Sequence, residues 1–362
     1  MDFSQAYAGL PVLVTGHTGF KGSWLCEWLL GLGAEVHGLA LEPDTTPSMF
    51  HQLGLAGRMN HMVADIRDRE SAVNAFAAAR PRAVFHLAAQ PLVRRSYQQP
   101  QETLATNVMG TANVLETVRT CDHPCVAVVV TSDKCYENLE TGRDYREGDA
   151  LGGRDCYSAS KAAAEVVTSA YRRSFFLDDP RKRVASARAG NVIGGGDWAE
   201  DRIVPDCIRH LQRGEPIPVR NPLATRPWQH VLEPLGGYLA LASRLLEGPI
   251  QGEGSPDDAS HAAFNFGPGP ESERCVQDLV EEVLKSWPGR WENKSDPSAP
   301  HEAHRLSLDI SKAARVLDWH PRWDFARTVR ETVEWYRAAQ TLVEPDDFQN
   351  LTRRQIDGYS RP

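Results

Sequence analysis

Residues 11–32 read PVLVTGHTGFKGSWLCEWLLGL, an apolar run that breaks at a glycine-rich turn and continues with the spacing of a helix. The apolar residues after the turn recur at helical intervals, namely Trp24, Leu25, Trp28, Leu29 and Leu32. Gly33 ends this helix, and residues 35–41 have the composition of a second buried strand. A strand, a glycine turn, a helix and a second strand within about thirty residues indicate a βαβ unit.

The alternation of strands and helices continues to residue 189. Further strands are expected at residues 62–64, 83–87, 127–131 and 183–189, and further helices at residues 70–79, 101–119 and 157–175. This order predicts an α/β fold with a parallel, doubly wound sheet of the Rossmann type, covered by helices on both faces.

The turn after the first strand has the glycine spacing G-x-x-G-x-x-G at Gly16, Gly19 and Gly22. Glycines allow a tight turn and a close approach of pyrophosphate, and the helix that follows offers free N–H groups to the phosphates. A plain strand-to-helix turn is the alternative. We interpret the segment as a dinucleotide site whose contacts are Gly16, Thr18, Gly19, Phe20, Lys21 and Gly22.

Two other strand ends are expected to contact the same dinucleotide. Asp65 and Ile66 follow the third strand, where a carboxylate can accept a hydrogen bond from adenine or cap a helix. The fourth strand ends in Leu87, Ala88, Ala89 and Gln90, which leave room for a ribose. Ala40 stands where NAD enzymes usually place an acid, and no arginine nearby can bind a 2′-phosphate, which favours NAD over NADP.

The chain is long enough for two lobes, since single cores stop growing at about 250–300 residues. Beyond Gly194, prolines become frequent and the strands short. We expect an NAD-binding domain with the catalytic residues at 1–190, a smaller α/β substrate-binding lobe at 191–345 with some segments returning to the sheet, and a tail at 346–362.

Composition excludes several classes of protein. Forty Lys and Arg against 48 Asp and Glu give a net charge of −8, which argues against a general nucleic-acid binder. The longest apolar runs are far below the roughly 20 residues of a membrane span, and no secretory signal is visible. The seven cysteines have no metal-ligand spacing, so we expect no metal, reduced thiols and a cytoplasmic location.

Tyr157 and Lys161 lie four residues apart in YSASK, on one face of a predicted helix. The lysine ammonium can lower the pKa of the phenol, which makes the tyrosine a usable base. The preceding strand ends in Thr131, Ser132, Asp133 and Lys134, and Asn107 in the long helix is a further candidate for the same site.

The glycine turn, the Tyr157–Lys161 pair and this strand end resemble extended short-chain dehydrogenase/reductases. Longer segments resemble the CDP-glucose 4,6-dehydratases of that family, namely TGHTGFKGSWL, HLAAQPLVRRSY, NVMGT, TSDKCYEN, YSASK, ARAGNVIGGGDWAEDR, RPWQHVLEP and NFGP. The resemblance extends from about residue 8 to about residue 340, nearly the whole chain.

The resemblance implies conversion of CDP-glucose to CDP-4-dehydro-6-deoxyglucose, with NAD as cofactor, in deoxysugar and lipopolysaccharide O-antigen biosynthesis. Tyr157 would deprotonate the 4-OH, Lys134 or a group that it activates would take the C5 proton, and Asp133 would protonate the leaving 6-OH. Related dTDP-glucose enzymes carry Asp-Glu where this chain has Asp133-Lys134. The expected catalytic residues are Ser132, Asp133, Lys134, Tyr157 and Lys161, and the expected cofactor contacts also include Asn107, Thr131, Tyr157 and Lys161. A simple ion pair between Asp133 and Lys134 is the alternative.

The nucleotide end of the substrate is expected near residues 191–228, where arginines suit a diphosphate. The expected substrate contacts are Ser96, Asn191, Gly195, Asp197, Trp198, Arg202, Arg220, Arg226 and Trp228. Trp198 can either stack on a base or pack beneath the loop.

Three other interpretations stay open: a dehydratase for a dTDP-, UDP- or GDP-sugar, a sugar-nucleotide 4-epimerase, and a non-catalytic NAD(H) sensor or scaffold. No nucleic-acid or membrane partner is expected. By resemblance, the long helices pair two copies into a homodimer, or further into a homotetramer. The small residues Gly110, Thr111, Ala112 and Ala162, Ala163, Ala164 are expected at that interface.

Overall fold

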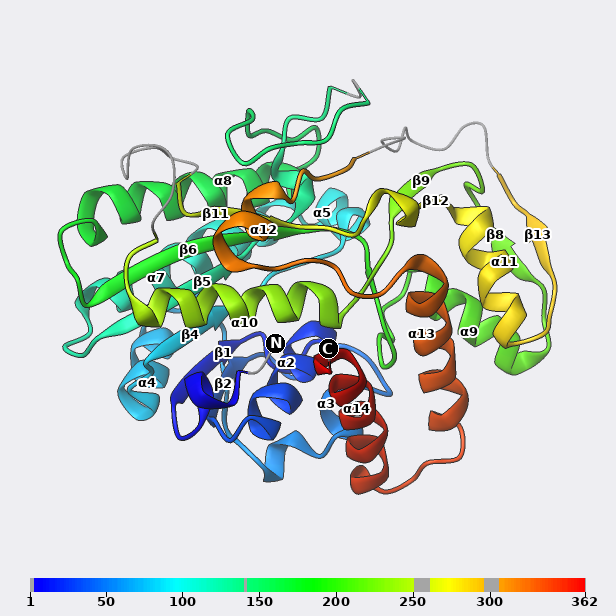
Figure 1. Ribbon diagram of the computed structural model, residues 1–362, viewed down its shortest axis with the longest axis horizontal. Helices are drawn as coiled ribbons and strands as arrows, with labels where there is room; N and C mark the ends of the chain where they lie inside the picture. The colour runs from blue at the N-terminus through cyan, green and yellow to red at the C-terminus, as the bar shows by residue number, and fades with distance from the viewer. Residues whose placement is uncertain (1–2, 140–141, 251–260, 296–305, 362) are drawn as a thin grey trace.

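Within residues 3–139, 142–250, 261–295 and 306–361, which the computed structural model describes, seven parallel strands form one central sheet (Figure 1). Across the sheet their order is β11-β6-β5-β4-β1-β2-β3. The strands are β1 (Pro11–Thr15), β2 (Glu35–Ala40), β3 (Asn60–Val63), β4 (Ala83–His86), β5 (Cys125–Val130), β6 (Lys182–Ala189) and β11 (Ala263–Phe266). The strand order reverses between β1 and β4, and ligands of such sheets bind at the carboxyl ends of the strands at this point. The predicted doubly wound α/β fold is confirmed.

Helices cover both faces of the sheet, and the strand side chains alternate between them. Val12 and Val14 of β1 lie in the larger core, whereas Leu13 lies in the core on the opposite face. The helices α2 (Phe20–Gly31) and α10 (Leu232–Glu247) pack on the first face. The second face is covered by α4 (Arg69–Ala79), α7 (Gly110–Thr120) and α8 (Cys156–Tyr171).

Both long helices predicted on the second face contain a π-helical turn. The first consists of α6 (Pro100–Leu104), the π turn η2 (Ala105–Met109) and α7. The second continues from α8 into the π turn η4 (Arg172–Phe176). Such turns are rare in helices and are frequent at functional sites, and the first one carries Asn107.

Residues beyond 191 form most of a second region, on the right of Figure 1. Three two-stranded sheets lie there: β7 (Val192–Ile193) with β10 (Gln229–His230), β8 (Ile217–Val219) with β13 (Trp291–Asn293), and β9 (Thr225–Pro227) with β12 (Glu273–Cys275). Its helices are α9 (Ile203–Arg213), α11 (Val276–Ser286) and α13 (Phe325–Ala339). Strand β11 belongs to the main sheet although it lies beyond residue 191.

The remaining short helical segments connect these elements. They are α1 (Ser4–Tyr7), α3 (Met49–Gln52), η1 (Leu55–Gly57), α5 (Val93–Gln98), η3 (Asp133–Cys135), η5 (Pro270–Ser272) and α12 (Ser311–Leu317). Among the described residues, no helix combines the length and the apolar character that crossing a membrane requires.

The expected C-terminal tail is instead the helix α14 (Pro345–Ser360), which packs against α2 and α13 (Figure 1). Its apolar side Phe348, Leu351 and Ile356 is buried in the larger core. Arg353 donates a hydrogen bond at 2.7 Å to Glu27, a fully buried carboxylate of α2. The polar composition of α14 concealed this helix, because only one of its faces is buried.

The sequence also favours a short strand near residues 305–308 and a surface loop at residues 248–263. No strand forms at the described residues 306–308, where Leu308 makes an isolated bridge to Tyr145. Residue 305 and most of the expected loop lie outside the described residues.

Candidate active site

The glycine turn fits the pyrophosphate of a dinucleotide. Gly16 has a φ of +75°, and a Cβ there would lie 2.7 Å from the backbone nitrogen of Ala88. A Cβ on Gly22 would lie 2.1 Å from the carbonyl oxygen of Gly16. A Cβ on Gly19 would meet only that same carbonyl oxygen, at 3.4 Å. The first turn of α2 has neither a side-chain cap nor an acid, so its N–H groups face no competing acceptor.

The second strand end carries no acid for a ribose, as expected from Ala40. Thr18 donates its hydroxyl hydrogen bond to the carbonyl oxygen of Leu41 at 2.8 Å, so the turn is attached to that strand end. Leu87 and Ala88 follow β4 and are hydrogen-bonded to Thr15 of β1, which places the third predicted cofactor segment beside the glycine turn.

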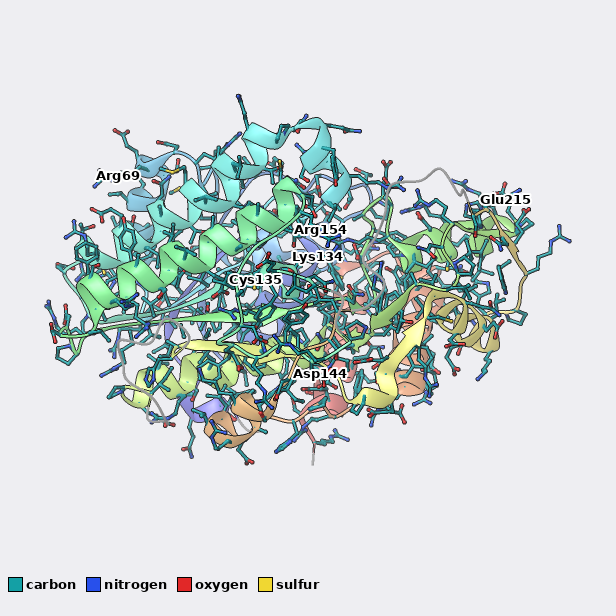
Figure 2. All side chains as sticks on the ribbon, turned by 90° about the horizontal axis from the view of Figure 1, so that it is seen from above. Arg69, Lys134, Cys135, Asp144, Arg154 and Glu215 are labelled. Atoms are coloured by element: carbon teal, nitrogen blue, oxygen red, sulfur yellow. The ribbon has the colours of Figure 1, made fainter. Side chains whose placement is uncertain are left out.

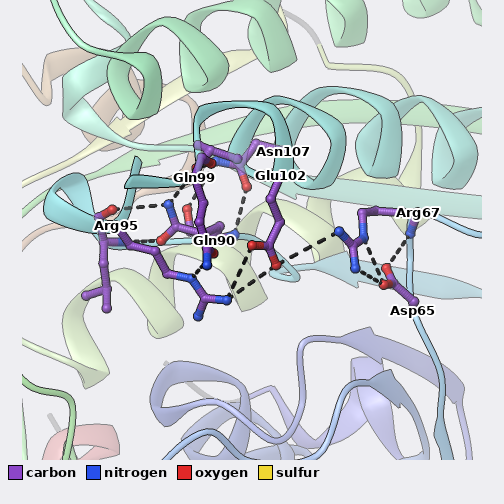
Figure 3. A network of polar contacts seen from close by, with 9 residues as sticks. Asp65, Arg67, Gln90, Arg95, Gln99, Glu102 and Asn107 are labelled. Carbon is purple, nitrogen blue, oxygen red and sulfur yellow. Dashed lines mark hydrogen bonds and ion pairs between the residues drawn. The ribbon is translucent and has the colours of Figure 1, made fainter. Parts of the chain in front are cut away.

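Asp65 is held by Arg67, and its carboxylate stays partly exposed. Arg67 donates side-chain hydrogen bonds at 2.5 and 2.8 Å to the carboxylate of Asp65. These bonds hold the pKa of Asp65 below its usual value. Figure 3 shows Arg67 between Asp65 and Glu102, which in turn contacts Arg95 at 3.3 Å.

Asn107 positions a neighbouring loop and a helix, and both ends of its amide are occupied. Its side chain accepts a hydrogen bond from the backbone of Gln90 at 2.8 Å (Figure 3). It also donates to Ser160 of α8 at 2.8 Å. The Gln90 side chain is buried and donates to Thr103. These contacts join the end of β4 to α8.

Ser132, Asp133 and Lys134 follow β5, where Ser132 caps the short helix η3 that contains the other two. Asp133 is 3% exposed, and Ser132 donates a hydrogen bond to its carboxylate at 2.9 Å. A Cβ on Gly190 would lie 1.9 Å from the other carboxylate oxygen, so only glycine leaves room for Asp133 there. Among the described residues, no ion pair joins Asp133 and Lys134, which disfavours the simple ion-pair interpretation.

Lys134 extends toward the predicted catalytic tyrosine. Its ammonium lies 6.0 Å from the centre of the Tyr157 ring, and its backbone N–H donates to Ser132 at 3.2 Å. Figure 2 shows Lys134 near the middle of the molecule, close to the α8 helix. The lysine is half-buried, so its amine can reach a ligand above the tyrosine.

Tyr157 and Lys161 are both buried on α8. Burial raises the pKa of Tyr157 to about 12, although a hydrogen bond with Ser132 and the charge of Arg202 act in the opposite direction. Burial also lowers the pKa of Lys161 to about 8, and this lysine donates to the carbonyl oxygen of Val130 at 3.4 Å. Desolvation is therefore the largest influence on the pKa of Tyr157.

Lys21 joins this charged cluster, although its glycine-turn position suggested only phosphate contact. Its ammonium donates to the hydroxyl of Tyr238 at 2.8 Å. Burial lowers the pKa of Lys21 to about 7, and the charges of Lys161 and Arg202 act in the same direction while Asp133 opposes them. These couplings show that side chains from α2, η3, α8 and the loop before α9 converge on one place.

A buried network behind Lys161 was not predicted from the sequence. Glu165, one turn further along α8, accepts hydrogen bonds from Thr131 at 2.5 Å, Ser186 at 2.7 Å and Arg188 at 2.8 Å. Glu165 and Arg188 are almost fully buried. The charge of Glu165 partly offsets the lowering of the Lys161 pKa by burial. Only the spacing of Lys161 and Glu165, four residues apart, could have suggested this network.

The arginines predicted for a diphosphate have acidic partners. Arg202 donates to Asp197 at 2.7 Å, and this ion pair raises the pKa of the guanidinium. Arg220 and Arg94 both contact Asp201, at 3.0 and 3.2 Å. The half-exposed Arg94 and Arg220 therefore come together from distant segments.

Several other predicted substrate residues have structural contacts. Ser96 is fully buried and donates to the carbonyl oxygen of Val93, and Gly195 is pressed against the ring of Trp335. Trp228 is 5% exposed and donates to the carbonyl oxygen of Arg274. These contacts favour packing roles over contact with a substrate.

The other predicted residues of this lobe lie in or beside the loops. Trp198 donates to Gln52 and packs edge-on against Tyr336, with the ring centres 5.2 Å apart, which favours packing beneath the loop over base stacking. Asn191 adopts a φ of +33° between β6 and β7. Arg226 lies in β9 and donates to the carbonyl oxygen of Thr225.

Known proteins resemble this chain along almost its whole length. The family described as GDP-mannose 4,6 dehydratase matches residues 13–247. The CDP-glucose 4,6-dehydratase of Salmonella typhimurium is 46% identical over 98% of this chain and 97% of its own. The dTDP-glucose 4,6-dehydratase of Streptomyces antibioticus is 30% identical over 93% of this chain and 95% of its own. The solved structure of DesIV, a dTDP-glucose 4,6-dehydratase from Streptomyces venezuelae with NAD bound, is 26% identical with a TM-score of 0.75, covering 92% of this chain and 99% of that one.

Proposed function

Because this chain belongs to the GDP-mannose 4,6-dehydratase family, we propose that it converts CDP-D-glucose to CDP-4-dehydro-6-deoxy-D-glucose and water. The observation that carries this proposal is the 46% identity to a CDP-glucose 4,6-dehydratase over 98% of the chain. The enzyme is thus an NAD-dependent sugar-nucleotide 4,6-dehydratase.

The glycine turn, the end of β4 and the face of α8 would hold the cofactor. When bound, NAD⁺ takes up a hydride from C4 of the sugar and returns it to C6 later in the reaction. Gly19 leaves space beside the free N–H groups of α2, which suits the pyrophosphate. Asp65 is the proposed contact for adenine, through the carboxylate surface that Arg67 leaves free.

Tyr157 accepts the proton of the sugar 4-OH in the first half of the reaction. Its pKa of about 12 means that the phenol holds its proton at rest. The hydroxyl of Ser132 and the charge of Arg202 favour the phenolate form of Tyr157.

Lys134 and Asp133 serve the elimination that follows. C5 of the sugar becomes acidic only when C4 is a ketone, and Lys134, or a group that it activates, then takes the C5 proton. Asp133 gives a proton to the departing 6-OH. The buried position of Asp133 over Gly190 and the reach of Lys134 toward Tyr157 support these separate roles.

The direct test is incubation of the purified enzyme with CDP-glucose. We expect the ultraviolet absorbance that 4-keto-6-deoxy sugars develop in alkali. A sugar that is not dehydrated, such as CDP-galactose, should not give this signal. Parallel reactions with dTDP-, UDP- and GDP-glucose, and with GDP-mannose, determine the nucleotide preference. Faster turnover of any of these than of CDP-glucose would contradict the proposed substrate, and release of CDP-galactose would instead indicate a 4-epimerase.

We also propose that the enzyme is a homodimer that pairs through the α6–α8 face. Exposed apolar side chains gather on these elements: Leu104, Met109, Val166 and Phe175 are between 41% and 57% exposed. Helix α8 packs against both α6 and η2, so these residues belong to neighbouring elements. Burial of this apolar surface in a second copy would stabilise the pair.

Some of the small residues expected at that interface pack inside the protomer instead. Gly110 packs against Ile66, and Ala162 and Ala164 are buried within the protomer. Sedimentation of the wild-type protein should give a dimeric mass, and Val166→Glu should shift the population toward monomer. A monomeric wild type at micromolar concentration would contradict the pairing, and a tetramer would extend it.

The free thiols of the seven cysteines suit a reducing compartment, so we place the enzyme in the cytoplasm. Its 4-keto-6-deoxy product is a precursor of deoxysugars, and we assign it to the biosynthesis of O-antigen lipopolysaccharide. Deletion of the gene, followed by analysis of the surface polysaccharide of the deletion strain, tests this assignment.

A further inference from the structure

Two cysteines and a lysine meet at the amino-terminal edge of the central sheet, at the opposite ends of the strands from the catalytic residues. Cys121 follows α7, Cys125 begins β5 and Lys182 begins β6. Lys182 is only 2% exposed, so its ammonium depends on the protein for every partner.

The three N–H donors of Lys182 are all used within this cluster. They go to the carbonyl oxygen of Cys121 at 2.9 Å, the carbonyl oxygen of His123 at 2.6 Å, and the sulfur of Cys121 at 2.6 Å. The two carbonyl acceptors are neutral. The sulfur can ionise, and a thiolate there gives the buried ammonium a charged partner.

Cys125 completes the cluster as a second thiol. A hydrogen bond from Cys125 is the largest influence that lowers the pKa of Cys121 to about 5, followed by Lys182 and His123, while partial burial opposes them. The same bond and complete burial raise the pKa of Cys125, so this residue keeps its proton. Cys121 is therefore the nucleophile, and Cys125, four residues further along the chain, is a neutral thiol that can react with its oxidised form.

The other buried cysteines have the opposite character. Burial raises the pKa of Cys26, Cys135 and Cys207, and none of them has a lysine at its sulfur. Cys121 is also partly exposed, whereas these three are buried. Reactive cysteines occur in such electropositive and accessible surroundings, and buried cysteines are inert.

We propose that Cys121 is a peroxide-reactive thiol and that Cys125 resolves its oxidised form into a Cys121–Cys125 disulfide. The Cys121 thiolate attacks one oxygen of a hydroperoxide, the O–O bond breaks, and the products are a sulfenic acid and a hydroxide or alkoxide that takes up a proton. The Cys125 thiol then attacks the sulfenic sulfur, and the S–O bond breaks with release of water. Two electrons pass from the two thiols to the peroxide, and a thiol reductant reverses the change.

The first test measures the activation of Cys121 by Lys182. At pH 6 the Cys121 sulfur is mostly thiolate, whereas a thiol with an ordinary pKa of about 8.5 is ionised to about 0.3%. Low-pKa thiolates are weaker nucleophiles, which offsets much of this difference and leaves an advantage of about tenfold. Alkylation of Cys121 by iodoacetamide at pH 6 should therefore slow in Lys182→Met, by up to about tenfold, because Cys125 and His123 still lower the pKa of Cys121 in this variant. The matched control Lys285→Met alters an exposed lysine and should leave the rate unchanged.

The second test follows oxidation in the intact, reduced enzyme. Both cysteines lie in the tryptic peptide 120–134, so the disulfide appears as the loss of two hydrogen masses in one peptide and as protection from alkylation. Sub-stoichiometric hydrogen peroxide should oxidise this peptide before those that contain Cys156 or Cys275. In Cys125→Ser the reaction should stop at a sulfenic acid on Cys121, which dimedone captures.

These outcomes decide the proposal even if Lys182→Met fails to fold, because Cys125→Ser leaves the lysine in place. Dimedone capture on Cys121 in that variant and disulfide formation in the wild type support the site. Earlier oxidation of Cys156 or Cys275, or an alkylation rate that Lys182→Met leaves unchanged, would overturn it. None of these outcomes depends on dehydratase activity.

Discussion

Replacement of Lys134 by alanine should separate the oxidation at C4 from the elimination that follows it. Tyr157 and Lys161 stay in place in Lys134→Ala, so the first proton and hydride transfers should proceed. Without a base for the C5 proton, the enzyme should then accumulate the reduced nicotinamide, and little product should form. We expect product formation to fall by about 10²–10⁴, the usual contribution of a positioned acid or base.

The structure shows that loss of stability cannot produce a change of this size. The side chain of Lys134 contacts the Tyr157 ring at 6.0 Å, and a cation–π contact at a partly exposed site contributes about 0.5–1 kcal/mol. That energy corresponds to a factor of about two to five, whereas a loss of 10²–10⁴ corresponds to about 3–5 kcal/mol. The backbone N–H of residue 134 still donates to Ser132 in the alanine variant, so η3 should persist.

Rapid mixing with CDP-glucose is the assay, with the nicotinamide absorbance and the alkali-dependent product signal followed in the same sample. Lys134→Glu introduces the acid present in the related dTDP-glucose enzymes and should recover part of the elimination. Arg154→Ala, which removes an exposed cation, is the matched control and should keep normal turnover. Normal product formation by Lys134→Ala would make this lysine structural, and the absence of both signals would move its role to binding or to the first step.

Three further changes test other parts of the site and the fold. Tyr157→Phe should lose about 10²–10⁴ in turnover while NAD binding, measured by fluorescence titration, stays within a few-fold; near wild-type turnover would remove Tyr157 from the mechanism. Gly190→Ala places a Cβ 1.9 Å from a carboxylate oxygen of Asp133. This variant should reduce dehydration at least as strongly as Asp133→Asn, while its circular dichroism spectrum stays like that of the wild type. Full activity would show that Asp133 can move without loss of function. Burial raises the pKa of Glu233 from 4.5 to about 7, so the folded state binds this proton more tightly than the unfolded state does. The stability linked to this proton, about 3 kcal/mol, should be present below pH 4.5 and should be lost as the pH rises to about 7. Glu233→Gln should flatten this part of the unfolding free energy against pH, and an unchanged slope would place the titration elsewhere.

The predicted fold agrees with the structure where local patterns decide the outcome. The strand β1, the glycine turn and α2 follow from a change of hydrophobic period at Gly16. The expectation for α14 was wrong because its residues carry many charges, and its helix depends on one buried face against α2. The π turn at Asn107 has no sequence signal that we recognise.

The candidate site divides in the same way. The spacing of Tyr157 and Lys161 places them on one helix face, and the sequence alone identifies them. The pKa of Tyr157 also depends on burial, which raises it, and on Ser132 and Arg202, which act in the opposite direction, and none of these three influences follows from the spacing. Trp228 and Gly195 looked like ligand contacts because they lie in recognisable motifs, but Trp228 belongs to the larger core and Gly195 packs against Trp335.

The sequence by itself determined the order of strands and helices, the dinucleotide turn and the catalytic pair, because each depends on residues a few positions apart. Tertiary structure decided which side chains share a site. The charges of Lys21 and Lys161 interact, and Arg188 bonds to Glu165, only after the strands are aligned in the sheet. The same alignment places the carboxylate of Asp133 over Gly190. Burial and charge at a residue depend on neighbours distant in the chain, so the properties that decide its chemistry are set by the packed fold.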